Sequence, residues 1–94
     1  MGEVYCNSVK IVGDMLRIAD EFRVSGVDPM SLLRKANLSY GRLSSVASKL
    51  MQAGLIDEQV QEGQRIYIIT SRGRDYLHKY MQFAEIADSF GLKL

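Results

Sequence analysis

The sequence is short of several things that particular classes of protein need. It holds one cysteine, Cys6, and one histidine, His78, so an internal disulfide is excluded and a zinc site of several such ligands has no material. No apolar run approaches the roughly 18 residues of a membrane-spanning helix, and the N-terminus has no signal-peptide pattern. We therefore expect a cytoplasmic protein without a metal, a cofactor or a membrane partner.

Enzymatic motifs are missing as well. The sequence has no Ser-His-Asp set, no paired carboxylates and no glycine-rich phosphate loop. Cys6 has no base or second cysteine nearby, so it is an idle thiol or a small apolar residue. His78 follows Leu77 on the polar side of a predicted helix, where a solvated histidine is expected. The sequence predicts a non-enzyme with no evident small-molecule site.

Acidic residues are absent from one long stretch. Residues 29–56 carry four cations and no carboxylate, for a net charge of +4, although the whole chain has a net charge of only +1. Residues 57–64 then carry three acids, and residues 65–80 have a net charge of +3. Such segregation of charge indicates a polyanionic partner.

The spacing of apolar residues predicts three helices in the first half of this single domain. The first begins at Asn7 or Ser8 and ends near Arg23, and a short β-prone piece follows at 24–27. Asp28 and the only proline, Pro29, start a second helix that Asn37 ends. Ser39 caps a third helix, which Gly54 closes.

The period then switches to that of strands. Residues 55–69 read as a β-hairpin, in which 57–64 form a polar turn with Gly63 at its tip. Thr70 caps a last helix that runs to Gly91. The predicted fold is mainly α with a small β-hairpin (α+β), and the order of elements is that of a winged helix-turn-helix with an extended C-terminal helix. We divide the chain into a winged-helix part, 1–69, and a C-terminal helix, 70–94.

Two motifs sharpen this prediction. ANLSYGRLSSVASKLMQAGLI and IYIITSRGRDYL resemble the turn, third helix and strand-to-helix junction of small archaeal winged-helix DNA-binding proteins of the Sulfolobus type and, more loosely, of wider archaeal winged-helix regulators. The resemblance spans nearly the whole chain and implies duplex DNA binding by a dimer that pairs through C-terminal helices in an antiparallel coiled coil. The chain departs from this family in its acidic wing and its shorter final helix.

The third helix has the surface of a recognition helix. On a helical wheel, Leu43, Val46, Ala47 and Leu50 point to the core, and the opposite face is short and free of acids. Carboxylates there would meet phosphates, so their absence suits a major groove. The residues we expect to contact DNA are Ser39, Tyr40, Arg42, Ser44, Ser45, Ser48, Lys49 and Gln52 in helix 39–53, Arg34 and Lys35 before it, and Gln64 and Arg65 on the hairpin.

Each assignment has a plainer alternative. The serine-rich face is also consistent with simple solvation. Arg34 and Lys35 equally suit the negative end of their own helix, and Tyr40 equally suits packing against helix two. Arg42 is able to pair with guanine, whereas Lys49 fits a phosphate better.

The last helix has more apolar surface than one stripe against its own domain can cover. We expect its excess to form a dimer interface, with two recognition helices presented to a two-fold-related target. The alternative is a monomer with Phe90 folded back onto helix one. The residues assigned to the interface are Leu77, Tyr80, Met81, Phe83, Ala84, Ile86, Ala87 and Phe90.

The leading hypothesis is a homodimeric, nucleoid-associated winged-helix protein that binds double-stranded DNA as a transcriptional regulator or a chromatin-associated protein. The alternative is a protein-interaction adaptor that uses the same fold without DNA, since a fold alone does not assign a function. A ligand- or redox-responsive regulator finds little support in one isolated cysteine.

Overall fold

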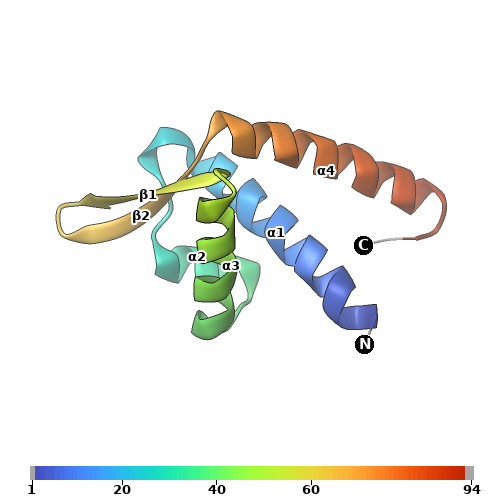
Figure 1. Ribbon diagram of the computed structural model, residues 1–94, viewed down its shortest axis with the longest axis horizontal. Helices are drawn as coiled ribbons and strands as arrows, with labels where there is room; N and C mark the ends of the chain where they lie inside the picture. Colours follow the sequence, from blue (N-terminus) through green and yellow to red (C-terminus); the bar gives the residue numbers. More distant parts are fainter. Residues whose placement is uncertain (1, 93–94) are drawn as a thin grey trace.

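The computed structural model describes the backbone of residues 2–92 and the side chains of residues 9–92. Within this range the elements follow in the order α1 (Gly2–Phe22), η1 (Arg23–Ser25), α2 (Pro29–Ala36), α3 (Tyr40–Gln52), β1 (Ile56–Gln61), β2 (Gln64–Ile69) and α4 (Ser71–Ser89). The β1–β2 hairpin projects from one end of the molecule, and α1 begins and α4 ends at the other (Figure 1). The predicted mainly α class with a small β-hairpin is confirmed.

The first helix is longer than the sequence predicted. α1 begins at Gly2, not at Asn7 or Ser8. Both residues are good N-caps, but in a helix interior they cost only some tenths of a kcal/mol each, so the helix continues through them. The interpretation of Cys6 as an idle or apolar thiol falls outside the described side chains.

The piece predicted as β-prone, 24–27, is mostly a 3₁₀ turn. Only Val27 pairs with the sheet. Its N–H donates to the Tyr67 carbonyl at 2.9 Å, and the Val27 carbonyl accepts from the Tyr67 N–H at 2.8 Å. Gly26 joins the 3₁₀ turn to Val27 with φ at +79°, a conformation that glycine adopts without steric cost. The β-propensity of the valines is therefore realised at a single bridge.

Both ends of α2 and the start of α3 are capped as the sequence predicted. The Asp28 carboxylate accepts from the Ser31 N–H at 3.2 Å and from the Ser31 hydroxyl at 2.7 Å, and the latter bond lowers the pKa of Asp28. Asn37 ends α2 at φ +57°. The Ser39 hydroxyl accepts from the Arg42 N–H at 3.2 Å. This N-cap starts α3 two residues after Asn37, the C-cap of α2.

The wing is a longer hairpin with a tighter turn than predicted. Strand pairing runs through to Gln61 opposite Gln64, so most of the polar stretch 57–64 is strand and not turn. Glu62 and Gly63 alone make the turn, with φ at +52° and +77°. Two successive positive φ values define a type I′ turn, whose twist matches that of the strands.

The core lies between α1, α2, α3 and the base of the hairpin. The predicted core stripe of α3 is confirmed, since Leu43, Val46, Ala47 and Leu50 are all buried. The largest fully buried side chains come from four segments: Met15, Leu16, Val27, Leu32 and Leu43. α3 is thereby held by one face only, and its other face is left to solvent.

α4 packs along α1 through a notch. A Cβ built on Gly13 would overlap the Tyr80 ring, so the glycine lets the ring lie against the α1 backbone. Leu77, Tyr80 and Ala87 are buried here. Their assignment to a dimer interface is therefore corrected, because their side chains belong to the core of their own chain.

The junction of α3, the wing and α4 explains the second sequence motif. α3 ends in a Schellman motif, in which Leu55 N–H bonds the Leu50 carbonyl at 2.9 Å and Gly54 has φ at +78°. The Thr70 hydroxyl donates to the Gly54 carbonyl at 2.6 Å and accepts from the Gly73 N–H at 3.0 Å. One side chain thus joins the end of α3 to the start of α4.

Candidate nucleic-acid interface

The outward side of α3 is a continuous exposed surface without a carboxylate. We call it the acid-free face, and it consists of Gly41, Arg42, Ser44, Ser45, Ser48, Lys49 and Gln52, all of which are exposed. Their predicted exposure is confirmed. The acidic hairpin does not cover them. Their contact with DNA stays a prediction.

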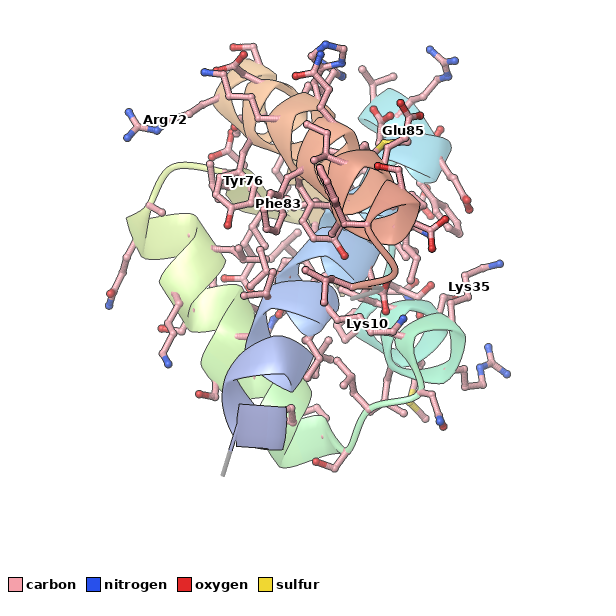
Figure 2. All side chains as sticks on the ribbon, turned by 90° about the vertical axis from the view of Figure 1, so that its right-hand side faces the viewer. Lys10, Lys35, Arg72, Tyr76, Phe83 and Glu85 are labelled. Carbon is pink, nitrogen blue, oxygen red and sulfur yellow. The ribbon has the colours of Figure 1, made fainter. Side chains whose placement is uncertain are left out.

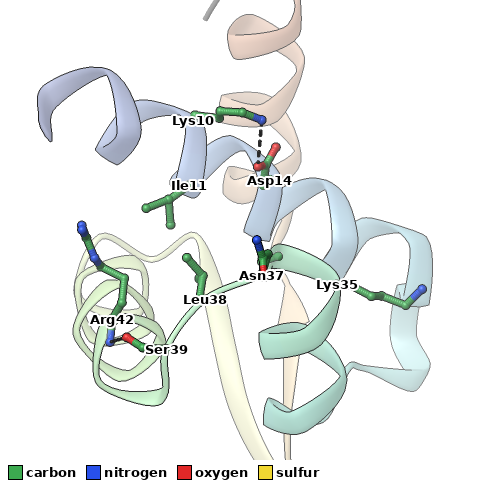
Figure 3. A pocket seen from close by; sticks show the side chains of 9 residues that line it. Lys10, Ile11, Asp14, Lys35, Asn37, Leu38, Ser39 and Arg42 are labelled. Atoms are coloured by element: carbon green, nitrogen blue, oxygen red, sulfur yellow. Dashed lines mark hydrogen bonds and ion pairs between the residues drawn. The ribbon is translucent and has the colours of Figure 1, made fainter. Parts of the chain in front are cut away.

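Short and long side chains are separated on this face. Gly41, Ser45 and Ser48 lie opposite the buried stripe, so the centre of the face carries little bulk. Arg42 and Lys49 are seven residues apart, so they lie on one row, along one edge. Figure 3 shows the Arg42 side chain rising from α3 toward α1. Its place at an edge favours a phosphate over a base as its partner.

These two cations are free to accept an external anion. Neither Arg42 nor Lys49 has a carboxylate within ion-pair distance among the side chains that the structure describes. Several cations elsewhere are paired, among them Arg74 with Asp20 at 3.3 Å and Lys79 with Asp75 at 3.1 Å. No carboxylate among the described side chains therefore neutralises the positive charge of the acid-free face.

An open groove runs beside Arg42, between α1 and the turn from α2 to α3 (Figure 3). Ile11 and Leu38 give it an apolar floor, and Lys10 lies on its rim with its amine 3.3 Å from the Asp14 carboxylate. Sequence patterns did not reveal this groove, because its walls come from three elements that meet only in the fold.

The two cations at the end of α2, Arg34 and Lys35, are both exposed but belong to a different helix from the acid-free face. Figure 2 shows Lys35 on the side of the molecule opposite α3. Its amine lies 6.0 Å from the centre of the Phe22 ring. Arg34 and Lys35 both occupy the last turn of α2, where cations complement the helix dipole. Lys35 also lines the groove beside Arg42, so its contact with DNA, like that of Arg34, stays a prediction.

Tyr40, the first residue of α3, is available to a partner. Its side chain is 63% exposed, so the alternative of packing against helix two is wrong. It follows the capping residue, Ser39, which is also exposed. Both therefore lie at the N-terminal end of α3, where a phosphate would find unpaired N–H groups.

The wing presents its one cation already paired. The Arg65 Nε lies 2.7 Å from a Glu58 carboxylate oxygen across the hairpin. A hydrogen bond to Tyr67 and the charge of Glu58 raise the pKa of Arg65. Gln64 is exposed beside the turn. The pairing was hidden in the sequence because it depends on the register of the strands.

The second half of α4 has a second apolar surface that its own chain leaves uncovered. Phe83, Ile86 and Phe90 are 55%, 56% and 75% exposed, so the alternative in which Phe90 folds back onto helix one is wrong. Met81 is 51% exposed, although the sequence placed it on the same seam as Leu77. In Figure 2, Tyr76 and Phe83 lie on one side of α4 and Glu85 on the other.

The described part of the chain also lacks membrane-spanning helices and metal-binding clusters of acidic, His and Cys side chains. No helix there is long and apolar enough to cross a membrane. No three His, Cys, Asp or Glu side chains there come together in a way that would hold a metal ion.

Comparisons with known proteins agree with the fold. A family model described as winged helix-turn-helix matches residues 7–88, which confirms the predicted resemblance. No curated protein matches the chain. The solved structure of Sso10a-2, a DNA-binding protein from Sulfolobus solfataricus, is similar with a TM-score of 0.75 at 18% identity, over 87% of this chain and 82% of that one.

Two further structures share the arrangement. MepR, a transcription regulator of the Staphylococcus aureus multidrug efflux pump MepA, has a TM-score of 0.74 at 15% identity over 89% of this chain, which spans 64% of MepR. F-93 of SSV1 has a TM-score of 0.61 at 17% identity, over 83% of this chain and 91% of that one. At these identities the likeness concerns the fold.

Proposed function

The chain belongs to the winged helix-turn-helix family, and we propose that it binds double-stranded DNA with α3 in the major groove, acting as a dimeric transcriptional regulator or chromatin-associated protein of the cytoplasm. The observation that carries this proposal is the acid-free face, which is exposed and has no carboxylate beside its cations. The printed descriptions of Sso10a-2 as DNA-binding and of MepR as a transcription regulator support it.

The distribution of side chains on α3 suits a groove. A major groove is about 12 Å wide and admits a helix of about 10–12 Å diameter only when the helix approaches with small side chains. Gly41, Ser45 and Ser48 supply such a centre. Arg42 and Lys49 on the edge then reach phosphates on one wall. Serines discriminate bases weakly, so affinity is mainly electrostatic and sequence preference is modest.

The salt dependence of binding tests this proposal. Two unpaired cations per subunit give a dimer about four phosphate contacts, so log Kd should rise with log salt concentration at a slope of about 3.6, from roughly 0.9 per contact. Fluorescence anisotropy of a labelled duplex over about 0.05–0.3 M salt measures it. No binding at the low end of this range would contradict the proposal and favour the adaptor.

The exposed surface of α4 has the spacing of a coiled-coil seam. Tyr76, Lys79, Phe83, Ile86 and Phe90 follow one another at alternating steps of three and four residues, and all are exposed. This is the a/d pattern by which one helix packs against another of the same kind. The seam lies beside the stripe that is buried on α1. We assign it to a second copy of the chain.

The charges on this seam favour an antiparallel pairing. In a parallel dimer Lys79 would face Lys79 of the second copy, and the two amines would repel each other. In an antiparallel pairing of a against d layers, Lys79 faces Phe83 of the second copy, and Tyr76 faces Ile86. The amine then lies near an aromatic ring, where its stem covers apolar surface.

Ile86→Asp is expected to weaken self-association by about a hundredfold or more, because each new carboxylate would be buried opposite Tyr76 of the second copy with no cation facing it. Sedimentation equilibrium measures the change. The matched control is Met81→Asp, since Met81 is also exposed on α4 but lies off the seam. A parent protein that sediments as a monomer, or an equal effect of both variants, would contradict this interface.

The same seam keeps the adaptor as a second candidate function. An exposed row of aromatic side chains is also what a different protein would need for docking. A dimer that binds duplex DNA with the expected salt slope favours the first function. A monomer without DNA binding favours the second.

A further inference from the structure

The wing of this chain carries an unusual charge for a part that would lie next to DNA. Asp57, Glu58 and Glu62 are acidic, and Arg65 is the only Lys or Arg between residues 55 and 70. The hairpin projects from the helical body (Figure 1), and among the described side chains Glu58 alone of these three acids forms an ion pair. These negative charges therefore act on any molecule that approaches the wing.

The strand register puts the one cation on the inner face of the hairpin. Arg65 alternates with Tyr67 and Ile69, and both of these are buried in the core. Glu58 pairs with Tyr67 in the ladder, and Arg65 pairs with Val60, so Glu58 and Arg65 are diagonal neighbours on one face. Tyr40 of α3 also contributes to the raised pKa of Arg65, which indicates that the two side chains lie near each other.

Arg65 is therefore in a suitable place for a phosphate but is bound to a carboxylate. The distance from its Nε to the Glu58 oxygen is 2.7 Å, and the side chain of Arg65 is 52% exposed. A charge-assisted bond at this distance is among the stronger ones in proteins. A phosphate that approached Arg65 would have to displace Glu58 or lie beside its negative charge.

We propose that Glu58 limits the affinity of the protein for duplex DNA of any sequence by masking Arg65, so that the wing adds no electrostatic attraction and the contact depends on α3. This inference rests on the proposed function. A sequence-independent phosphate contact strengthens binding to every duplex alike. Masking it lowers the affinity for every duplex by the same factor and leaves the contacts that α3 makes unchanged.

Glu58→Gln is expected to free Arg65 for a phosphate. One added contact per subunit steepens the log–log salt slope by about 0.9 and tightens binding about eightfold at 0.1 M salt. In a dimer the salt slope is steeper by about 1.8, and the roughly eightfold gain in affinity applies once for each subunit, so the two factors multiply. The gain should be as large on a random duplex as on any preferred site.

Two variants separate masking from a general change in charge. Asp57→Asn removes the same charge from the same strand, but Asp57 lies on the opposite face of the hairpin, so it should tighten binding much less. Adding Arg65→Gln to Glu58→Gln should abolish the gain. Circular dichroism of each variant tests whether the substitution in the hairpin has left the fold intact.

Each outcome of this experiment decides something. A gain with Glu58→Gln that needs Arg65 supports masking. Equal gains with Asp57→Asn and Glu58→Gln, or a gain that survives loss of Arg65, would show an effect of net charge and overturn the inference. Weaker binding with Glu58→Gln would show that the carboxylate instead orients Arg65 toward DNA. Absence of binding by the parent protein would contradict the proposed function itself.

Discussion

Replacing Arg42 and Lys49 together by alanine is expected to weaken binding to duplex DNA by about 3.6 orders of magnitude at 0.1 M salt. The two cations lie on the edge of the acid-free face without a carboxylate partner among the described side chains. A dimer of the variant loses about four phosphate contacts, each contributing roughly 0.9 logarithmic units at this salt concentration. Anisotropy titration measures the change in Kd, and the salt slope should fall toward zero.

A charge-matched variant controls for net charge. Arg17→Ala with Arg74→Ala removes two cations that lie outside α3 and are paired within the chain, Arg17 with Asp14 at 3.5 Å and Arg74 with Asp20 at 3.3 Å. This variant should bind DNA within a fewfold of the parent, because exposed charges farther than a Debye length of about 10 Å from the duplex are largely screened. Equal losses in the two double variants would remove α3 as the contact surface.

Replacing Gly73 by alanine is expected to lower the free energy of unfolding by about 3 kcal/mol, at the upper end of what an added methyl costs in a packed site. A Cβ built on Gly73 would overlap the carbonyl oxygen of Leu55. That oxygen accepts from the Thr70 N–H at 3.0 Å, so it is held by the junction and has no room to retreat. Thermal unfolding should show a melting temperature lower by roughly 15 °C.

The control for this substitution is Gly41→Ala. Gly41 is also helical, but a Cβ built on it meets nothing within 4 Å. It should gain a few tenths to about 1 kcal/mol from helix propensity. A loss of stability at Gly41 like that at Gly73 would mean that the effect is not one of space at the junction.

Local signals predicted the elements well where they involve neighbouring residues. Asp28, Ser39 and Thr70 cap the helices that they were expected to cap. The turn of the hairpin was predicted with too many residues. A positive φ at a glutamate such as Glu62 is unusual, so sequence propensity does not predict it. The start of α1 was missed for a similar reason, since a good capping residue is also tolerated inside a helix.

The candidate interface divides in the same way. The composition of α3 predicted an exposed face without acids, and that face is exposed. The wheel could not tell which of two apolar stripes of α4 the protein buries, so Leu77 and Tyr80 were assigned to the partner although α1 covers them. Lys35 was grouped with Arg42 by sequence, and the two line one groove although they belong to different helices.

The sequence by itself determined the helices, their caps, the hairpin and the segregation of charge, because these depend on residues within a turn or two of one another. Only the tertiary structure decided which cations are free. Arg42 and Lys49 form no ion pair with any side chain of residues 9–92, whereas Arg65 pairs with Glu58 through the strand register and Arg74 pairs with Asp20 of α1. Coulomb interaction depends on distance in space, which the order of residues along the chain does not contain.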